Sequence, residues 1–171
     1  EWKAIQLHPL TCTAFNADFD WDQMAIHLPI TDQAQREARD LMVTSKNLLA
    51  PSSWEPIVAP GQDMILWNYY VTAMEEGGLW EGKVFSNIND VGLAYEAWVL
   101  WIKSKIKVRI NWEFVETNYG RLLFNEIVPE GLGFINETLR KWAIKKILAR
   151  SFEELWAEVT AQFVDQIKNF W

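Results

Sequence analysis

Residues 16–22 read Asn-Ala-Asp-Phe-Asp-Trp-Asp and place three carboxylates, those of Asp18, Asp20 and Asp22, at alternate positions of one short segment. Carboxylates this close repel one another, so without a cation at least one of their pKa values should be raised. A hard dication would balance the charge, and a site made only of oxygen ligands favours Mg²⁺, Mn²⁺ or Ca²⁺. The segment therefore indicates either a metal-binding loop or a solvated acidic turn.

The residues that follow exclude a calcium loop of the EF-hand type. Counted from Asp18, such a loop needs glycine at its sixth position and glutamate at its twelfth. This chain has Gln23 and Pro29 there. The EF-hand reading is therefore excluded, while the identity of a bound ion stays open at this point.

Composition sets further limits on what the chain can be. Its 171 residues, 50% hydrophobic and 23% charged, predict one globular domain or two small ones sharing a core. The single Cys12 excludes a disulfide scaffold and a Cys-rich zinc site, and is typical of a reducing compartment. The net charge of −7 argues against an independent nucleic-acid-binding domain with a broad basic surface. No membrane span or signal peptide is evident, so a cytoplasmic location is expected. The chain starts with Glu1, which indicates a fragment.

Hydrophobic periodicity and capping residues predict an α+β fold that is helix-rich toward its C-terminus. Thr31 can cap a helix with Ala34, Ala38, Leu41 and Met42 on one face, and Ser86 can cap another. Ser151 with Glu154 is a capping-box pattern, so a single helix should run from there to Lys168 if position 156 is tryptophan. If position 156 is glycine, the first helix should end there and a second should start near Val159. The other expected elements are strands at 4–7 and 25–29, extended or irregular chain at 8–15, helices at 62–74, 87–97, 119–127 and 136–149, and a hairpin of 105–110 with 113–116.

The acidic segment and its surroundings resemble a known family. L-H-P-L at 7–10 and N-A-D-F-D-W-D-Q-M-A-I-H-L-P at 16–29 are similar to the active-site segment of the largest catalytic (beta-prime) subunit of bacterial DNA-directed RNA polymerase. The family signature N-A-D-F-D-G-D is matched at every position except Trp21. The similarity continues with E-A-R-x-L-M at 37–42, N-L-L-A-P at 47–51, P-I-V-A-P-x-Q-D at 56–63, K-I-K-V-R-I at 105–110, T-x-x-G-R at 117–121 and I-V-P at 127–129.

This resemblance implies a fold and a function. Residues 1–50 would be the C-terminal part of a double-psi β-barrel, with Asp18, Asp20 and Asp22 holding the catalytic Mg²⁺. Residues 51–171 would form a helix-rich pore or secondary-channel region with a β-hairpin. The implied reaction is Mg²⁺-dependent transfer of nucleotides from nucleoside triphosphates to the RNA 3′ end, because a metal there activates the 3′-hydroxyl and stabilises charge on the phosphate.

The same resemblance suggests substrate contacts and partners. Asn16 matches an asparagine beside the incoming ribose, although an asparagine that shapes the turn through its own side chain is an equal alternative. Gln62 matches a residue near the channel through which nucleotides arrive. The implied partners are the beta, alpha and omega subunits and, through the assembled enzyme, the DNA template and the RNA. No membrane partner is expected, and the isolated chain should be inactive.

Other polar residues are interpreted as structural. His8 and His27 flank apolar segments without a nucleophile or an acid partner in the sequence pattern, and Arg121 follows a glycine at the start of a helix. The basic residues near the hairpin are better explained as a solvated face than as a nucleic-acid groove; they are Lys103, Lys105, Lys107 and Arg109.

Tryptophan is unusually abundant, with 11 residues against 8 glycines, whereas roughly 12 glycines would be ordinary for this length. Trp112 follows Asn111 between two alternating segments, where Asn-Gly is the preferred hairpin turn. We hypothesise that these tryptophans are UGA codons translated under the wrong genetic code, in an organism that reads UGA as glycine. The alternative is real tryptophan in a Trp-rich binding module or a non-catalytic, decayed fragment. Positions that a glycine would explain are 2, 21, 54, 67, 80, 112 and 156, and less firmly 98, 101, 142 and 171.

Overall fold

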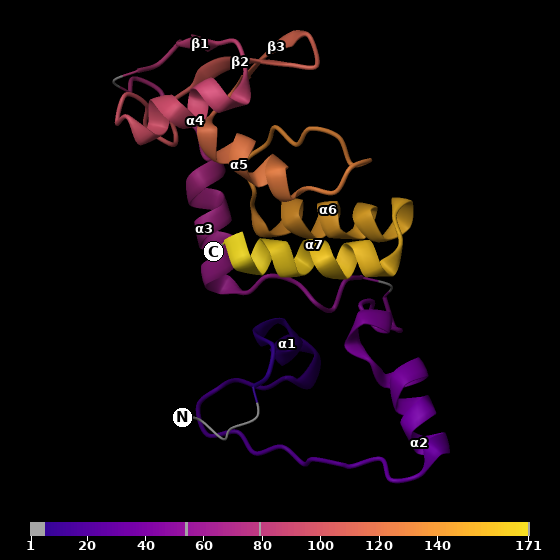
Figure 1. Cartoon of the computed structure of the whole chain (residues 1–171). Helices are drawn as coiled ribbons and strands as arrows, with labels where there is room; N and C mark the ends of the chain where they lie inside the picture. Colours follow the sequence, from indigo (N-terminus) through magenta and orange to yellow (C-terminus); the bar gives the residue numbers. More distant parts are fainter. Residues whose placement is uncertain (1–5, 54, 79, 171) are drawn as a thin grey trace.

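A computed structural model of the chain describes residues 6–53, 55–78 and 80–170. These residues form a helical body, from which residues 12–43, called the N-terminal arm below, extend (Figure 1). In chain order the elements are η1 Pro9–Thr11, α1 Cys12–Phe15, α2 Asp32–Glu37, the π-helical turn η2 Ala38–Met42, η3 Thr44–Lys46, α3 Gln62–Thr72, β1 Val84–Phe85, α4 Ile88–Glu96, β2 Ile106–Ile110, β3 Glu113–Thr117, α5 Tyr119–Ile127, α6 Lys141–Glu154 and α7 Ala157–Phe170.

A small sheet with strand order β1-β2-β3 lies at one end of the body (Figure 1). Strand β2 pairs with β3 antiparallel, from Ile106 opposite Thr117 to Ile110 opposite Glu113, and with β1 parallel. Ile106 and Val108 point into a core, whereas Lys107 and Arg109 face solvent, as the alternation predicts. The predicted hairpin is confirmed, and the short strand β1 was not expected.

Two hydrophobic cores stabilise the body. The smaller core lies between α4, α5 and the sheet and contains Val91, Leu100, Ile106, Val108 and Leu122. In the larger core, helices α6 and α7 lie side by side against α3 and α5 (Figure 1). Its buried members are Leu10, Leu48, Val58, Met64, Phe124, Leu132, Ile135, Leu139, Ile144, Ile147, Leu148, Phe163, Val164 and Ile167.

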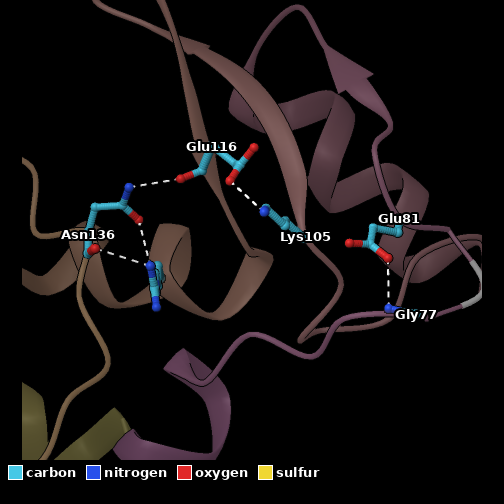
Figure 2. A network of polar contacts seen from close by, with 6 residues as sticks. Gly77, Glu81, Lys105, Glu116 and Asn136 are labelled. Atoms are coloured by element: carbon cyan, nitrogen blue, oxygen red, sulfur yellow. Dashed lines mark hydrogen bonds and ion pairs between the residues drawn. The ribbon is translucent and has the colours of Figure 1, made fainter.

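Arg121 joins these parts through a buried guanidinium group, only 5% exposed. Its Nε donates to the Thr72 carbonyl at 2.9 Å, and its Nη1 and Nη2 donate to Asn136 and Thr138. Burial lowers the pKa of Arg121. Asn136 in turn donates to the Glu116 carbonyl at 2.8 Å, and the Glu116 carboxylate meets Lys105 at 2.8 Å (Figure 2). The structural role predicted for Arg121 is confirmed.

The first described residues differ from the expectation. Residues 8–15, predicted as extended or irregular, form η1 and α1. His8 explains the difference, because its Nδ1 accepts from the Leu10 N–H and its carbonyl accepts from the Thr11 hydroxyl, while Pro9 supplies a helical φ. Of the strand predicted at 4–7, residues 4 and 5 lie outside the described residues, and Gln6 and Leu7 form no strand. The strand predicted at 25–29 is wrong, since that segment carries no assigned strand.

Three helix boundaries also need correction. Asn87, not Ser86, caps α4, because its side chain accepts from the Asp90 N–H. The helix expected at 136–149 is Lys141–Glu154, so Ser151 lies inside it and its buried hydroxyl bonds that of Thr160 at 3.0 Å. The prediction of a single helix from Ser151 to Lys168 is therefore wrong: the helix is interrupted at residues 155–156, and α7 begins at Ala157.

The N-terminal arm carries its apolar residues on the surface. The Thr31 side chain accepts from the Ala34 N–H, which confirms this cap, but Leu41 and Met42 are exposed. Within residues 6–50 the only strand-like pairing is the isolated bridge of Leu49 to Pro56, so the double-psi barrel stays an expectation. Among the described residues, no helix is long and apolar enough to span a membrane.

The close packing of α3 on α5 makes a testable prediction. A Cβ on Gly120 would lie 1.9 Å from the Val71 carbonyl oxygen, so Gly120→Ala must separate the two helices. We expect the free energy of unfolding of the chain, measured in urea, to fall by about 1–3 kcal/mol or more. The matched control is Gly92→Ala in α4, where the nearest atom would be the Tyr119 hydroxyl at 3.5 Å. This control should gain up to about 1 kcal/mol from helix propensity. Equal stability of the two variants would contradict the packing.

Candidate metal centre

Asn16 directs the chain from α1 into the acidic loop. It adopts the left-handed conformation, with φ 49° and ψ 45°, which asparagine tolerates better than most residues. The N–H of Ala17 then donates back to the Cys12 carbonyl at 3.0 Å. This short helical stop brings residues 18–22 next to α1.

The loop gathers its three carboxylates around one point. One oxygen from each of Asp18, Asp20 and Asp22 lies within 4.8 Å of the others. Backbone groups of the loop hold this arrangement: the Asp18 N–H donates to Asp22 at 3.1 Å, and the Asp20 N–H donates to Asp18 at 3.3 Å. The Trp21 N–H donates to Asp20 at 2.6 Å. Residues 16–22 therefore form a loop, as the sequence predicts, and these hydrogen bonds curl it so that the three carboxylates converge.

The carboxylates also affect one another's protonation. The side-chain hydrogen bond with Asp20 raises the pKa of Asp18, and repulsion from Asp20 and Asp22 adds to the effect. The same hydrogen bond lowers the pKa of Asp20, helped by the Trp21 N–H. Of the two carboxyls, Asp18 is therefore the one that takes up a proton more readily.

The donor set fits a hard dication. All three side chains are exposed and offer only oxygen atoms, which are the ligands that Mg²⁺ prefers. Two oxygens bound to one Mg²⁺ lie up to about 4.2 Å apart, twice the usual bond length. The loop is thus close to the spacing that a shared ion needs. An open hollow of about 530 Å³ beside it is lined by Cys12, Thr13, Asn16, Ala17, Asp18 and Asp22.

The structure places the other predicted site residues at different distances from this cluster. Asn16 lines the hollow together with Asp18 and Asp22, so both interpretations of its role remain open. Gln62 is the first residue of α3. The sequence pattern did not indicate Cys12 and Thr13, because only the reversal of the chain at Asn16 brings them to the loop.

The remaining polar residues have structural contacts or face solvent. His8 does have an acid partner, contrary to the sequence expectation: its Nε2 lies 2.7 Å from Asp165. This contact ties the start of the described chain to α7, which agrees with a structural role. His27 is exposed. Lys103 pairs with Glu75 at 2.9 Å and Lys105 pairs with Glu116, while Lys107 and Arg109 are exposed. The exposed Lys107 and Arg109 agree with a solvated face, whereas the Lys103 side chain is only 13% exposed and does not.

Comparison with known proteins gives matches over nearly the whole chain. Residues 1–44 match the model of RNA polymerase Rpb1, domain 2, and residues 47–171 that of RNA polymerase Rpb1, domain 3. The chain is 47% identical over 170 residues to DNA-directed RNA polymerase subunit beta' of Hydrogenobaculum sp. (strain Y04AAS1), covering 99% of this chain and 11% of that protein. The subunit beta' of Sulfurihydrogenibium sp. (strain YO3AOP1) is 45% identical, with the same coverage. That of Thermobifida fusca (strain YX) is 42% identical, covering 99% of this chain and 15% of the relative. The chain therefore spans only a small part of the length of these relatives.

The opposite pKa shifts of Asp18 and Asp20 predict an order of titration in the metal-free chain. Asp18 should protonate at a higher pH than Asp20, because the pKa of Asp18 is raised and that of Asp20 is lowered. Side-chain carboxyl carbon shifts, followed by NMR as the pH falls, report both groups. Asp18→Ala removes the main cause of the low pKa of Asp20, so the Asp20 midpoint should move to higher pH. An unchanged Asp20 midpoint in this variant would show that Asp18 is not what lowers the pKa of Asp20.

Proposed function

Because this chain belongs to the RNA polymerase Rpb1 family, we propose that its residues 16–22 hold the catalytic Mg²⁺ of a DNA-directed RNA polymerase. The observation that carries the proposal is the convergence of Asp18, Asp20 and Asp22 within 4.8 Å in a chain whose relatives are named as polymerase beta' subunits. The proposed reaction is the addition of nucleoside triphosphates to the RNA 3′ end.

Each carboxylate has a defined task in this proposal. The oxygens of Asp18, Asp20 and Asp22 bind and orient one ion, and Asp18, whose pKa is raised, must be deprotonated to do so. When bound, the ion would lower the pKa of the attacking 3′-hydroxyl of the RNA and balance the negative charge on the phosphate. Since the loop depends on deprotonated ligands, its metal affinity should fall as the pH is lowered.

The remaining parts of the proposal concern position and partners. Residues 1–50 belong to a double-psi barrel that carries the metal loop, and residues 51–171 line the pore or secondary channel. Asn16 contacts the incoming ribose, and Gln62 lies near the path of the nucleotide. The beta, alpha and omega subunits, the template DNA and the RNA act on this chain through the assembled enzyme.

The exposed apolar surface of the N-terminal arm supports an assembled setting. Ile26, Leu28, Ile30, Leu41 and Met42 all expose most of their surface. Soluble proteins seldom leave a run of large apolar residues uncovered, so these residues should be covered by protein in the enzyme. A loop that is exposed in the chain alone lacks the support that fixes ligands in a working site, and for that reason the isolated chain should be inactive.

A Trp-rich binding module is the second candidate, because every described tryptophan is exposed. That candidate requires the indoles to be present in the protein that the organism makes.

The proposal predicts the effect of removing one ligand. In the assembled enzyme, Asp20→Ala should abolish RNA elongation while leaving subunit assembly intact, because the exposed side chain contributes a metal ligand and no packing. Elongation rates on a fixed template, measured at saturating Mg²⁺, test this expectation. Asp40→Ala is a charge-matched control, since Asp40 is exposed and lies outside the loop. A rate for Asp20→Ala within roughly tenfold of the unmutated enzyme, about 1.4 kcal/mol in the barrier, would contradict the assignment.

A further inference from the structure

Residues with a left-handed backbone reveal which positions need glycine. In the described residues, nine have a positive φ: four glycines, Asn16, Asn111, and three tryptophans, Trp80, Trp98 and Trp112. Glycine adopts this region freely, and asparagine is the side chain that next tolerates it. A bulky aromatic residue there is an outlier, so three such outliers of one residue type call for a common cause.

Trp112 occupies the second position of a two-residue hairpin turn. Asn111 and Trp112 have φ of 47° and 72° and connect Ile110 to its partner Glu113. Positive φ at both central positions defines a type I′ turn, for which Asn-Gly is the strongest sequence preference. The Asn is present, and the tryptophan stands where the glycine belongs.

Trp98 occupies the position after a helix end where glycine is also preferred. Helix α4 ends with Ala97 as its cap, and Trp98 follows with φ 57°. The Trp98 N–H donates to the Tyr95 carbonyl at 3.0 Å and the Val99 N–H to the Ala94 carbonyl at 2.9 Å. This pair of bonds is the Schellman motif, whose left-handed residue is usually glycine.

Trp80 lies in a loop that is already built from glycine. Its φ is 148°, and its neighbours Gly77 and Gly82 have φ of 81° and 80°. The Gly77 N–H donates to the Glu81 carboxylate at 2.7 Å, which closes the loop (Figure 2). The Trp80 N–H donates to the Gly78 carbonyl at 2.9 Å. Positions 77, 80 and 82 of this loop therefore all have a positive φ, and two of the three are glycine.

Burial does not compensate for these conformations. The eight described tryptophans expose between 39% and 94% of their surface, although tryptophan is ordinarily among the well-buried residues. Lys83 lies over the Trp80 ring at 4.4 Å and Arg109 over that of Trp112 at 5.5 Å. Such exposed cation–π contacts are weak, and they do not relieve the backbone.

We infer that positions 80, 98 and 112 are glycine in the protein that the organism makes, and that their codons are UGA read as glycine. The other described tryptophans, at 21, 67, 101, 142 and 156, have no positive φ, so their backbones do not demand glycine. At Trp156 the expected helix break is present without a left-handed residue. A codon-level cause nevertheless extends to every position with the same codon. At Trp21 it would remove an exposed indole from between two of the metal-loop carboxylates.

Mass spectrometry of the native protein tests the inference directly. RNA polymerase purified from the organism that carries this gene should yield a tryptic peptide Ile110–Arg121 with the mass of glycine at position 112. Peptide Val84–Lys103 should likewise carry glycine at position 98. Sequencing of the gene should show UGA at codons 80, 98 and 112. Tryptophan at position 98 or 112 of these peptides, or UGG at codons 80, 98 and 112, would overturn the inference and leave the Trp-rich module as the better account of the indoles.

Thermal unfolding of the full 171-residue chain tests the backbone argument separately. Trp112→Gly should raise the Tm, whereas Trp112→Ala should not, because alanine loses the indole but keeps the strain of a positive φ. Trp67 in α3, which has no positive φ, is the matched position: there the glycine variant should be less stable than the alanine variant. If the glycine variant were more stable than the alanine variant at both positions, or less stable at both, the backbone argument would be contradicted. If a variant does not fold, the peptide masses still decide the inference.

Discussion

Repulsion among three carboxylates is the main physical constraint on the metal loop, residues 16–22. Asp18, Asp20 and Asp22 stay together because loop N–H groups donate to them. These contacts hold the ligands near one another without neutralising them fully. The remaining charge is what allows a dication to bind, so an arrangement that is costly in the free chain becomes favourable in the loaded enzyme.

The rest of the structure provides a fixed base for that loop. Leu10 lies in the larger core, and His8 bonds Asp165 of α7, so the segment just before the loop is attached to the body at two points. The body itself depends on the contact of α3 with α5, where Gly120 leaves room for the Val71 carbonyl. Beside this contact, Arg121 links both helices to residues 136–138. Beyond the loop the arm is exposed, which is consistent with a surface that other parts of an RNA polymerase cover.

Local patterns predicted much of this arrangement. The hairpin of β2 with β3 follows from alternation, α5 from its helical period, and the three ligands from their spacing in a single loop. Features that depend on contacts far along the chain were not predictable. The break between α6 and α7 places Ser151 against Thr160 in the core, although the sequence around Ser151 looks like a helix start. Likewise, η1 and α1 are one-turn helices held by side chains of His8 and Thr11, too short to show a period. Cys12 and Thr13 reach the loop only through the left-handed Asn16.

The central claim is that residues 16–22 bind the catalytic ion, and metal-directed cleavage tests it most directly. Fe²⁺ can replace Mg²⁺ in an assembled RNA polymerase that contains this chain, and with a reductant and peroxide it cuts the backbone nearest to it. The account predicts cleavage confined to residues 16–22 on this part of the chain, and its loss as Mg²⁺ is added in competition. Cleavage that spares this loop, or that persists unchanged at high Mg²⁺, would contradict the claim.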